Sequence, residues 1–240
     1  MYVLDMHCHI LPGVDDGAKD EAMSMEMLGI AYSQGIRKMI LTPHYYVGKN
    51  KYKAVDFRRI FSDFAPKANI KYPDLELYLG NEIYYTKGAL DEVRAGNICT
   101  MADTKYVLIE FSPRVSYNEL YGAVREFVQG RYRPVIAHVE RYQCLTRQLD
   151  RIAELTENGA YLQMNADSMT GSMFDGQTKW CRKLVTEGYI SVIGTDAHNL
   201  DDRAPYVQQT IEWMRKKLDA ESMEMMLHGN GELMLENKYL

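Results

Sequence analysis

Short apolar runs alternate with longer amphipathic segments along this 240-residue chain. The runs span residues 2–8, 38–42, 75–80, 106–111, 134–138, 160–164 and 189–194. Apolar runs of strand length, separated by segments with a helical period, predict a parallel sheet whose strands are joined by crossover helices. We therefore expect an α/β fold, and seven such units favour a closed, distorted seven-stranded (βα) barrel of the TIM-like kind over an open sheet.

The segments between the runs carry their own signals for helices. One predicted helical face consists of Leu120, Val124, Phe127 and Val128, and another consists of Phe57, Ile60, Phe61 and Phe64. Glycines that suit a left-handed turn after a helix are Gly35, Gly130, Gly159 and Gly188. Residues 201–227 should be largely helical and pack outside the barrel. No repeat or linker divides the sequence, so we expect one domain over residues 1–240.

Most of the histidines stand at the ends of the apolar runs, together with several carboxylates. The histidines are His7, His9, His44, His138 and His198, and the acids are Glu82, Glu110 and Asp196. Barrel enzymes place their chemistry at strand ends, and imidazole with carboxylate is a ligand set for divalent metals. The repeated placement predicts a polynuclear metal site. The sixth histidine, His228, lies in a polar segment and is expected at the surface.

Alternation along the first run places His7 and His9 on one face of a strand with Asp5, while Cys8 points the other way. The following loop contains Asp15-Asp16-Gly17, a sequence that is by itself more often a turn than a ligand. Glu110 ends an apolar run, where a carboxylate needs a partner or a metal. Arg141 and Arg203 follow His138 and His198 by a few residues; they suit either phosphate binding or helix capping.

Composition excludes several classes of protein. Net charge is −5 without a basic stripe, which argues against nucleic acid, and no run approaches the roughly 18 apolar residues of a membrane span. The chain starts directly with a strand-like pattern, so we expect no signal peptide. Four scattered cysteines favour free thiols in a reducing cytoplasm. No cysteine is followed six positions later by arginine, which excludes a Cys-x5-Arg phosphate loop.

Taken together, these motifs resemble the polymerase-and-histidinol-phosphatase (PHP) superfamily. The resemblance covers residues 2 to about 205 and rests on Asp5-Met-His7-Cys-His9, Asp16-Gly17, Thr42-Pro-His44, Gly80-Asn-Glu82, Ile109-Glu110, Ala137-His138-Val-Glu-Arg141-Tyr142, Gln163-Met-Asn165-Ala166 and Asp196-Ala-His198-Asn199. Within the superfamily, the chain is similar to the manganese-dependent protein-tyrosine phosphatases of bacterial capsular and exopolysaccharide operons, the CpsB/YwqE type. The likeness implies the distorted seven-stranded (βα) barrel of the PHP fold, with three metals.

Carried over position by position, the resemblance implies three ligand sets. The first metal would be held by His7, His9, Glu82 and Asp196; the second by Glu82, Glu110 and His138; the third by Asp16, His44 and His198. Asp16 is preferred to Asp15 because the family's ligand directly precedes glycine. Arg141 and Arg203 fall where the family binds phosphate. The metals are expected to be Mn, although Fe and Zn share these ligands.

The residues and the resemblance together predict a metal-dependent protein-tyrosine phosphatase. Three divalent cations against four ligand carboxylates leave a charge of about +2, a suitable field for a phosphate dianion. The expected partner is a phosphotyrosine-bearing bacterial tyrosine kinase that controls polysaccharide assembly. Two alternatives stay open: a small-molecule phosphoesterase acting on histidinol phosphate or a nucleotide, and a metal-stabilised regulator that binds phosphotyrosine without turnover. Oligomeric state is not fixed by the sequence.

Overall fold

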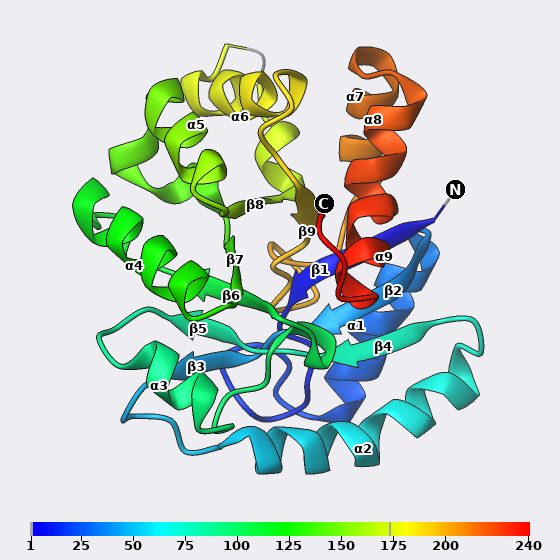
Figure 1. Cartoon of the computed structure of the whole chain (residues 1–240). Helices are drawn as coiled ribbons and strands as arrows, with labels where there is room; N and C mark the ends of the chain where they lie inside the picture. Colours follow the sequence, from blue (N-terminus) through cyan, green and yellow to red (C-terminus); the bar gives the residue numbers. More distant parts are fainter. Residues whose placement is uncertain (1, 173) are drawn as a thin grey trace.

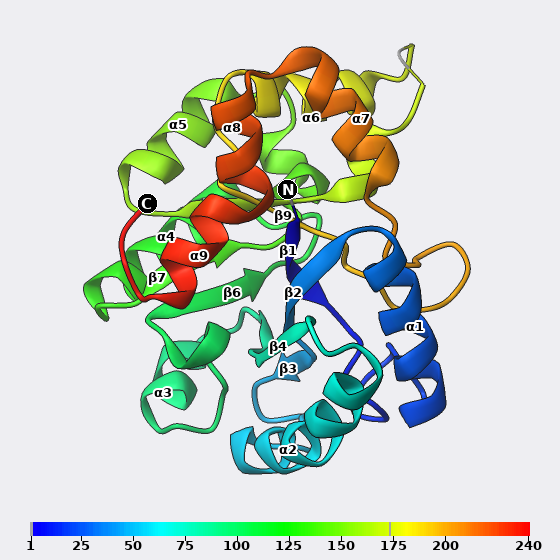
Figure 2. The same cartoon turned by 90° about the vertical axis from the view of Figure 1, so that its right-hand side faces the viewer.

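The computed structural model describes residues 2–172 and 174–240 and has an α/β architecture in which helices surround parallel strands (Figures 1 and 2). The strands are β1 (Val3–Cys8), β2 (Ile36–Leu41), β3 (His44–Tyr46), β4 (Glu76–Leu79), β5 (Glu82–Tyr84), β6 (Tyr106–Glu110), β7 (Arg133–Ile136), β8 (Tyr161–Asn165) and β9 (Val192–Gly194). They form two sheets, ordered β1-β2-β4 and β3-β5-β6-β7-β8-β9, and every pairing between neighbours is parallel.

Helices follow most strands, as the alternating pattern predicts. They are α1 (Glu21–Ser33), α2 (Ala54–Lys71), α3 (Ala89–Arg94), α4 (Tyr117–Gln129), α5 (Leu149–Glu157), α6 (Gly176–Thr186), α7 (Gln208–Lys217), α8 (Ala220–Glu224) and α9 (Asn230–Leu235), with a π-helical turn at Met225–Gly229. Short 3₁₀ turns lie at Met101–Asp103, Val139–Arg141, Gln143–Leu145 and Ala166–Met169. None of the helices in the described residues is long and apolar enough to cross a membrane.

Each of the seven predicted runs overlaps a strand, but the described residues hold nine strands in two sheets because two units are split, so the closed seven-stranded barrel is not confirmed. The break between β2 and β3 falls at Thr42-Pro43, and the break between β4 and β5 falls at Gly80-Asn81. Proline has no N–H to give to a ladder, and the Asn81 side-chain amide donates to the Pro43 carbonyl at 2.9 Å. After these breaks, β3 begins at His44 and β5 begins at Glu82, and the two residues are cross-strand partners.

The chain segment after β9 lies against β1. Cys8 and Ala197 form an isolated parallel bridge, the His9 amide donates to the Ala197 carbonyl at 2.9 Å, and the Asp196 amide donates to the His7 carbonyl at 2.7 Å. The end of the six-stranded sheet therefore delivers Asp196 and His198 beside the histidines of the first strand. One buried apolar cluster extends from Val3 to Leu227, so the fold holds this edge on a continuous core.

Several local predictions need correction. Residues 117–129 form α4 as predicted, yet Val128 is 38% exposed because it lies at the margin of the apolar face. Gly130 has a φ of −69°, and Arg131 takes the left-handed conformation instead. A Cβ at Gly130 would lie 2.9 Å from Leu90, so close packing explains this glycine. Residues 201–207 form no helix.

His228 is not at the surface. Its ring stacks on Tyr2 with centroids 4.5 Å apart, and only 13% of its side chain is exposed. The polar composition around it hid the fact that the π-helical turn packs against β1 and β9.

Candidate metal centre

The side chains predicted as metal ligands meet at the C-terminal ends of the strands. His7 lies near the end of β1, His44 and Glu82 begin the short strands β3 and β5, and Glu110 ends β6. His138 follows β7, while Asp196 and His198 follow β9. This is the edge of a parallel α/β fold at which chemistry is usually placed.

The first group consists of two histidines and two carboxylates around one point. The Nε2 atoms of His7 and His9 are 3.1 Å apart. Glu82 Oε2 lies 3.3 and 3.2 Å from these nitrogens, and Asp196 Oδ1 lies 3.6 and 3.5 Å from them. All four side chains are buried. Two imidazole nitrogens and two acid oxygens at these separations converge as ligands do around a cation.

The second group uses the other oxygen of Glu82. His138 Nε2 lies 2.9 Å from Glu82 Oε1 and 3.6 Å from Glu110 Oε1. Glu82 therefore faces two positions with its two carboxylate oxygens, which is the arrangement of a bridging ligand.

The third group is formed by Asp16, His44 and His198. Asp16 Oδ1 lies 3.5 Å from the Nε2 atoms of both His44 and His198. Asp16 is the acid of the pair that faces these two rings, whereas neighbouring Asp15 turns toward His9. Asp15 Oδ2 accepts from His9 Nδ1 at 2.8 Å and from the His44 amide at 3.0 Å.

Further polar side chains orient the ligand groups. Gln163 Oε1 lies 3.1 Å from His7 Nδ1 and accepts the His138 amide at 2.7 Å. Asn165 donates to Asp196 Oδ2 at 2.9 Å and accepts from the Gln163 amide at 3.0 Å. With its Nδ1 engaged, each of His7 and His9 directs Nε2 into the cluster, the usual relation between a metal-binding histidine and its outer partner.

The backbone at the site is strained at two of the ligand positions. His138 has a φ of 31° and Asp196 a φ of 51°, values in the left-handed region that only glycine adopts freely. Such conformations cost about 1–3 kcal/mol each and persist where the surroundings fix them. Gly194, just before this turn, admits no side chain, because a Cβ there would lie 2.6 Å from the His7 Cβ.

Several buried atoms of the cluster have no hydrogen-bond partner. Among the described residues they include His44 Nδ1, Glu82 Oε2 and His198 Nε2. Orphaned donors and acceptors are rare in folded proteins because each is strongly destabilising. His44 Nδ1 and Glu82 Oε2 face each other at 3.0 Å, and His198 Nε2 lies 3.5 Å from Asp16 Oδ1. Their positions and chemistry fit divalent metal ions.

The pKa values of the cluster agree with a demand for positive charge. Burial raises the pKa of Glu82, but nearby His7 and His138 outweigh it and hold this pKa well below its usual range. Burial and the charge of Glu82 raise the pKa of Glu110 to about 7. Burial lowers the pKa of His138 and of His198, which favours the neutral imidazole that binds metals.

Two arginines lie together beside the cluster. The Nη2 atoms of Arg141 and Arg203 each lie 2.8 Å from the same oxygen of Asp196. Their side chains are 42% and 36% exposed, so both guanidinium groups also reach solvent. They line a cavity of about 140 Å³ together with Asn165, Thr195, Asp196 and Tyr206, among others. A tetrahedral anion entering this cavity would meet two planar donors at once.

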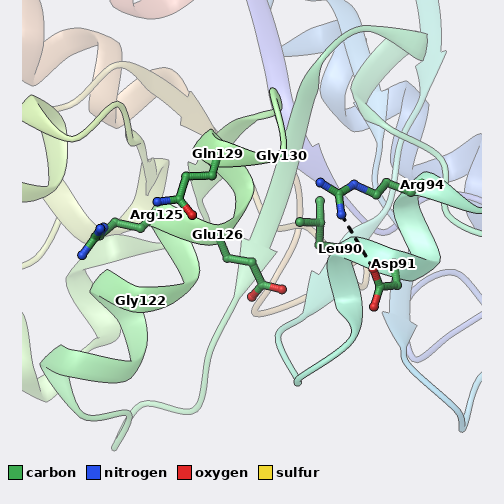
Figure 3. A pocket seen from close by; sticks show the side chains of 8 residues that line it. All are labelled: Leu90, Asp91, Arg94, Gly122, Arg125, Glu126, Gln129 and Gly130. Carbon is green, nitrogen blue, oxygen red and sulfur yellow. Dashed lines mark ion pairs between the residues drawn. The ribbon is translucent and has the colours of Figure 1, made fainter.

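Another surface groove, of about 470 Å³, lies between α3 and α4 and contains none of these residues (Figure 3). Leu90, Arg94, Arg125 and Glu126 are among its lining side chains, and Asp91 pairs with Arg94 at 3.8 Å. The described residues that line this groove carry both signs of charge and include no histidine, so it is not the metal centre.

Sequence reasoning missed the roles of Asp15, Gln163 and Asn165. Gln163 and Asn165 were part of the resemblance without a function, yet their spacing of two at the end of β8 already places both on one face. Asp15 was considered only as an alternative ligand.

Comparisons with known proteins were made for sequence and for structure. A family model described as "Capsular polysaccharide synthesis, CpsB/CapC" matches residues 3–236. The tyrosine-protein phosphatase CpsB of Streptococcus pneumoniae is 33% identical over 95% of this chain and 96% of its own length. The tyrosine-protein phosphatase YwqE of Bacillus subtilis is 36% identical over 98% and 92%, respectively.

Solved structures give the same picture. A chain from the crystal structures of YwqE and CpsB, described as unique metal-dependent tyrosine phosphatases, matches with a TM-score of 0.90 and 31% identity, covering 99% of this chain and 96% of that one. A phosphotriesterase homology protein from Escherichia coli, complexed with phosphate, matches at a TM-score of 0.58 and 12% identity over 95% and 97%. This second likeness concerns the fold alone.

Proposed function

Because this chain belongs to the CpsB/CapC family of capsular polysaccharide synthesis, we propose that it is a metal-dependent protein-tyrosine phosphatase. The observation that carries the proposal is the convergence of nine candidate ligand side chains beside two arginines that share one carboxylate oxygen. Relatives that are named tyrosine-protein phosphatases and cover almost the whole chain support the same activity.

The site is proposed to hold three divalent cations, with Mn as the first candidate and Fe or Zn as alternatives. The ligand sets are His7, His9, Glu82 and Asp196; Glu82, Glu110 and His138; and Asp16, His44 and His198. When bound, such cations activate water as a nucleophile and offset the charge of phosphate oxygens. The orphaned atoms Glu82 Oε2 and His198 Nε2 support this assignment.

The chain's own residues bind and orient the phosphate. Arg141 and Arg203 are proposed to donate to its oxygens, as charge-assisted hydrogen bonds that strengthen while negative charge develops. Asp196 holds both guanidinium groups at 2.8 Å and so sets where they point. Asn165 fixes that same Asp196 oxygen from the other side at 2.9 Å.

A cysteine nucleophile does not fit this chain. Cys8, Cys99 and Cys181 are buried, and burial raises the pKa of each thiol, which disfavours the thiolate that would attack phosphorus. No arginine stands six positions after a cysteine, as a Cys-x5-Arg phosphate loop requires. Phosphotyrosine suits the metal site because a phenol, with a pKa of about 10, leaves more readily than an alkoxide.

The finer proposals rest on the family. We take the chain as a single domain whose seven strand regions correspond to a distorted (βα) barrel of the PHP kind, and the cytoplasm as its compartment. Its proposed substrate is a bacterial tyrosine kinase that regulates capsular or exopolysaccharide assembly, since the matching family is described by capsular polysaccharide synthesis.

The decisive experiment compares phosphotyrosine peptide with histidinol phosphate and a nucleotide on one protein sample, with metal content measured in parallel. We expect turnover of the phosphotyrosine peptide, loss of it with chelator and recovery with Mn. Faster turnover of a small phosphate ester would replace the proposal with a small-molecule phosphoesterase. Tight binding of the peptide without turnover at full metal content would indicate a regulator.

A further inference from the structure

Tyr46 on β3 and Tyr84 on β5 lie two residues beyond the proposed ligands that begin these strands. β3 pairs with β5 in the register His44 to Glu82 and Tyr46 to Tyr84. Residues two apart on a strand share a face, so Tyr46 and Tyr84 stand on the same face as the two ligands. They lie nearer the C-terminal edge by about 6.6 Å, the rise of two residues. The register therefore places the two tyrosine side chains, here called the aromatic layer, next to the side chains of His44 and Glu82, here called the ligand layer.

The side chains of the aromatic layer are in contact with one another and with the site. The rings of Tyr46 and Tyr84 have centroids 5.4 Å apart, and the Tyr46 ring lies 5.5 Å from that of His44. Tyr84 pairs across the sheet with Glu110 on β6. Tyr84 is half-buried beside Tyr46, whereas Tyr46 is 38% exposed. Tyr46 thus offers an open aromatic surface supported by Tyr84.

A second tyrosine candidate for contact with substrate is Tyr206, which lines the cavity of the two arginines and is 55% exposed. It belongs to the loop before α7, and within the described residues no aromatic pair includes its ring. An unsupported ring keeps more conformational freedom, which lowers what it gains by stacking.

We propose that Tyr46, backed by Tyr84, forms the wall against which the phenol ring of the substrate phosphotyrosine packs. The inference rests on the proposed phosphatase function and adds a specificity-determining residue to it. A phosphate held at the ligand layer with its ester oxygen toward solvent places the attached ring at the height of Tyr46. An aliphatic phosphate ester has no ring to fill this place, so the wall favours aryl over alkyl substrates.

The test compares wild type, Tyr46→Ala and Tyr46→Phe on a phosphotyrosine peptide and on acetyl phosphate, an activated substrate without a ring. Aromatic contacts predict a 3- to 10-fold fall in the peptide-to-acetyl-phosphate ratio of kcat/KM for Tyr46→Ala. The fall should appear mainly in KM for the peptide. Tyr46→Phe keeps the ring and should keep most of the ratio.

Binding gives a readout apart from turnover. Calorimetry on metal-loaded protein should show that Tyr46→Ala weakens phenylphosphonate by a similar factor but weakens methylphosphonate less. An unchanged ratio in Tyr46→Ala, or a fall in Tyr206→Ala instead, would overturn the wall. Wild type that cleaves acetyl phosphate but not the peptide would overturn the phosphatase proposal, and the wall with it.

Discussion

Two polar clusters lie at opposite edges of the strands, and they differ in how their charges are satisfied. The first is the ligand cluster at the C-terminal edge. The second, here called the opposite-edge network, consists of Tyr2 just before β1, Lys38 on β2, Glu76 and Tyr78 on β4, and Glu232 on α9. In this network Lys38 Nζ lies 3.0 Å from Glu232 and 3.4 Å from Glu76. Tyr2 donates to Glu232, and Tyr78 donates to Glu76 at 2.6 Å.

Every charge in the opposite-edge network meets an opposite charge or a donor, whereas like atoms converge in the ligand cluster. There, the Nε2 atoms of His7 and His9 face each other at 3.1 Å, and Glu82 Oε2 has no hydrogen-bond partner. His138 and Asp196 add backbone strain. Clustering of polar side chains is thus not enough to indicate a site. Converging ligand atoms without hydrogen-bond partners on a strained backbone do indicate a site, because only an additional group satisfies them.

The strongest way to break this comparison is to exchange one carboxylate for its amide in each cluster. Glu82→Gln keeps the shape but removes the charge that faces two proposed metal positions. We expect metal content to fall and aryl phosphate turnover to drop by at least about 1,000-fold, since Lewis-acid stabilisation is worth several kcal/mol. Metal analysis and kinetics on the same sample provide the measurement. Full metal occupancy with normal turnover would refute the bridging role.

The next largest effect is expected at the arginines. Arg141→Ala or Arg203→Ala should leave metal content unchanged but lower turnover by roughly 30- to 1,000-fold, because each would remove a proposed charge-assisted contact of the transition state. Lysine should restore only part of the rate, since a point charge cannot reproduce a bidentate fork. Inorganic phosphate should inhibit wild type more than either variant. If both alanine variants match wild type, the arginines serve only to hold Asp196.

The sequence allowed this site to be predicted because strand order and strand ends are encoded locally. Apolar runs mark the strands, and the C-terminal ends of parallel strands lie at the same edge of the fold. Proposed ligands 189 residues apart, such as His7 and Asp196, could therefore be grouped from the sequence. The adjacent pair Asp15 and Asp16 shows the limit. Spacing alone gives both carboxylates equal access, and the choice between them depended on the resemblance.

What the sequence could not give depends on packing between distant elements. The splits at Pro43 and Gly80 fall at the ends of two apolar runs, and the short strands β3 and β5 that follow carry no apolar run of their own, so nine strands could not be counted in advance. Gly130 stands where a glycine usually ends a helix, but the structure requires a glycine there because a Cβ would clash with Leu90, forty residues away in the sequence. His228 lies in a polar stretch and still stacks on Tyr2. Each of these wrong predictions depends on a contact with a residue distant in the sequence, which a local sequence pattern does not identify.

Acidity offers a third way to sharpen the contrast. The pKa of Glu110 is raised to about 7 by burial and by Glu82, so protons compete with metal for this carboxylate as pH falls through 7. Apparent metal affinity should fall by up to about tenfold per pH unit below that point, measured by metal content after dialysis at each pH. Glu110→Gln should bind less metal throughout and lose this part of the pH dependence. A flat profile in wild type would contradict the assignment.

A smaller effect is expected for Asp15, which acts on His9 without facing the cluster. Asp15→Asn should lower metal affinity by about 10- to 100-fold, the usual effect of losing an outer partner of a ligand histidine. Competition with a chromophoric chelator measures it. Asp20→Asn is the matched control, because Asp20 caps α1 by accepting the Met23 amide and touches no ligand. Equal affinities for the two variants would show that Asp15 does not orient His9.

The smallest effect is predicted at the opposite-edge network. Glu232→Gln weakens the ion pair with Lys38. The side chain of Lys38 is 19% exposed and that of Glu232 is 29% exposed, so solvent screens much of the attraction. A loss of about 0.5–1 kcal/mol in the free energy of unfolding is expected, which lowers Tm by roughly 1–4 °C in a chain of this size. Urea denaturation of metal-loaded protein measures it. Metal content and turnover should equal those of wild type, because all charges here are already paired within the protein. A Glu232→Gln variant that lost metal would show that the two edges are coupled through β1 and β2, and the contrast between a satisfied network and an unsatisfied site would no longer hold.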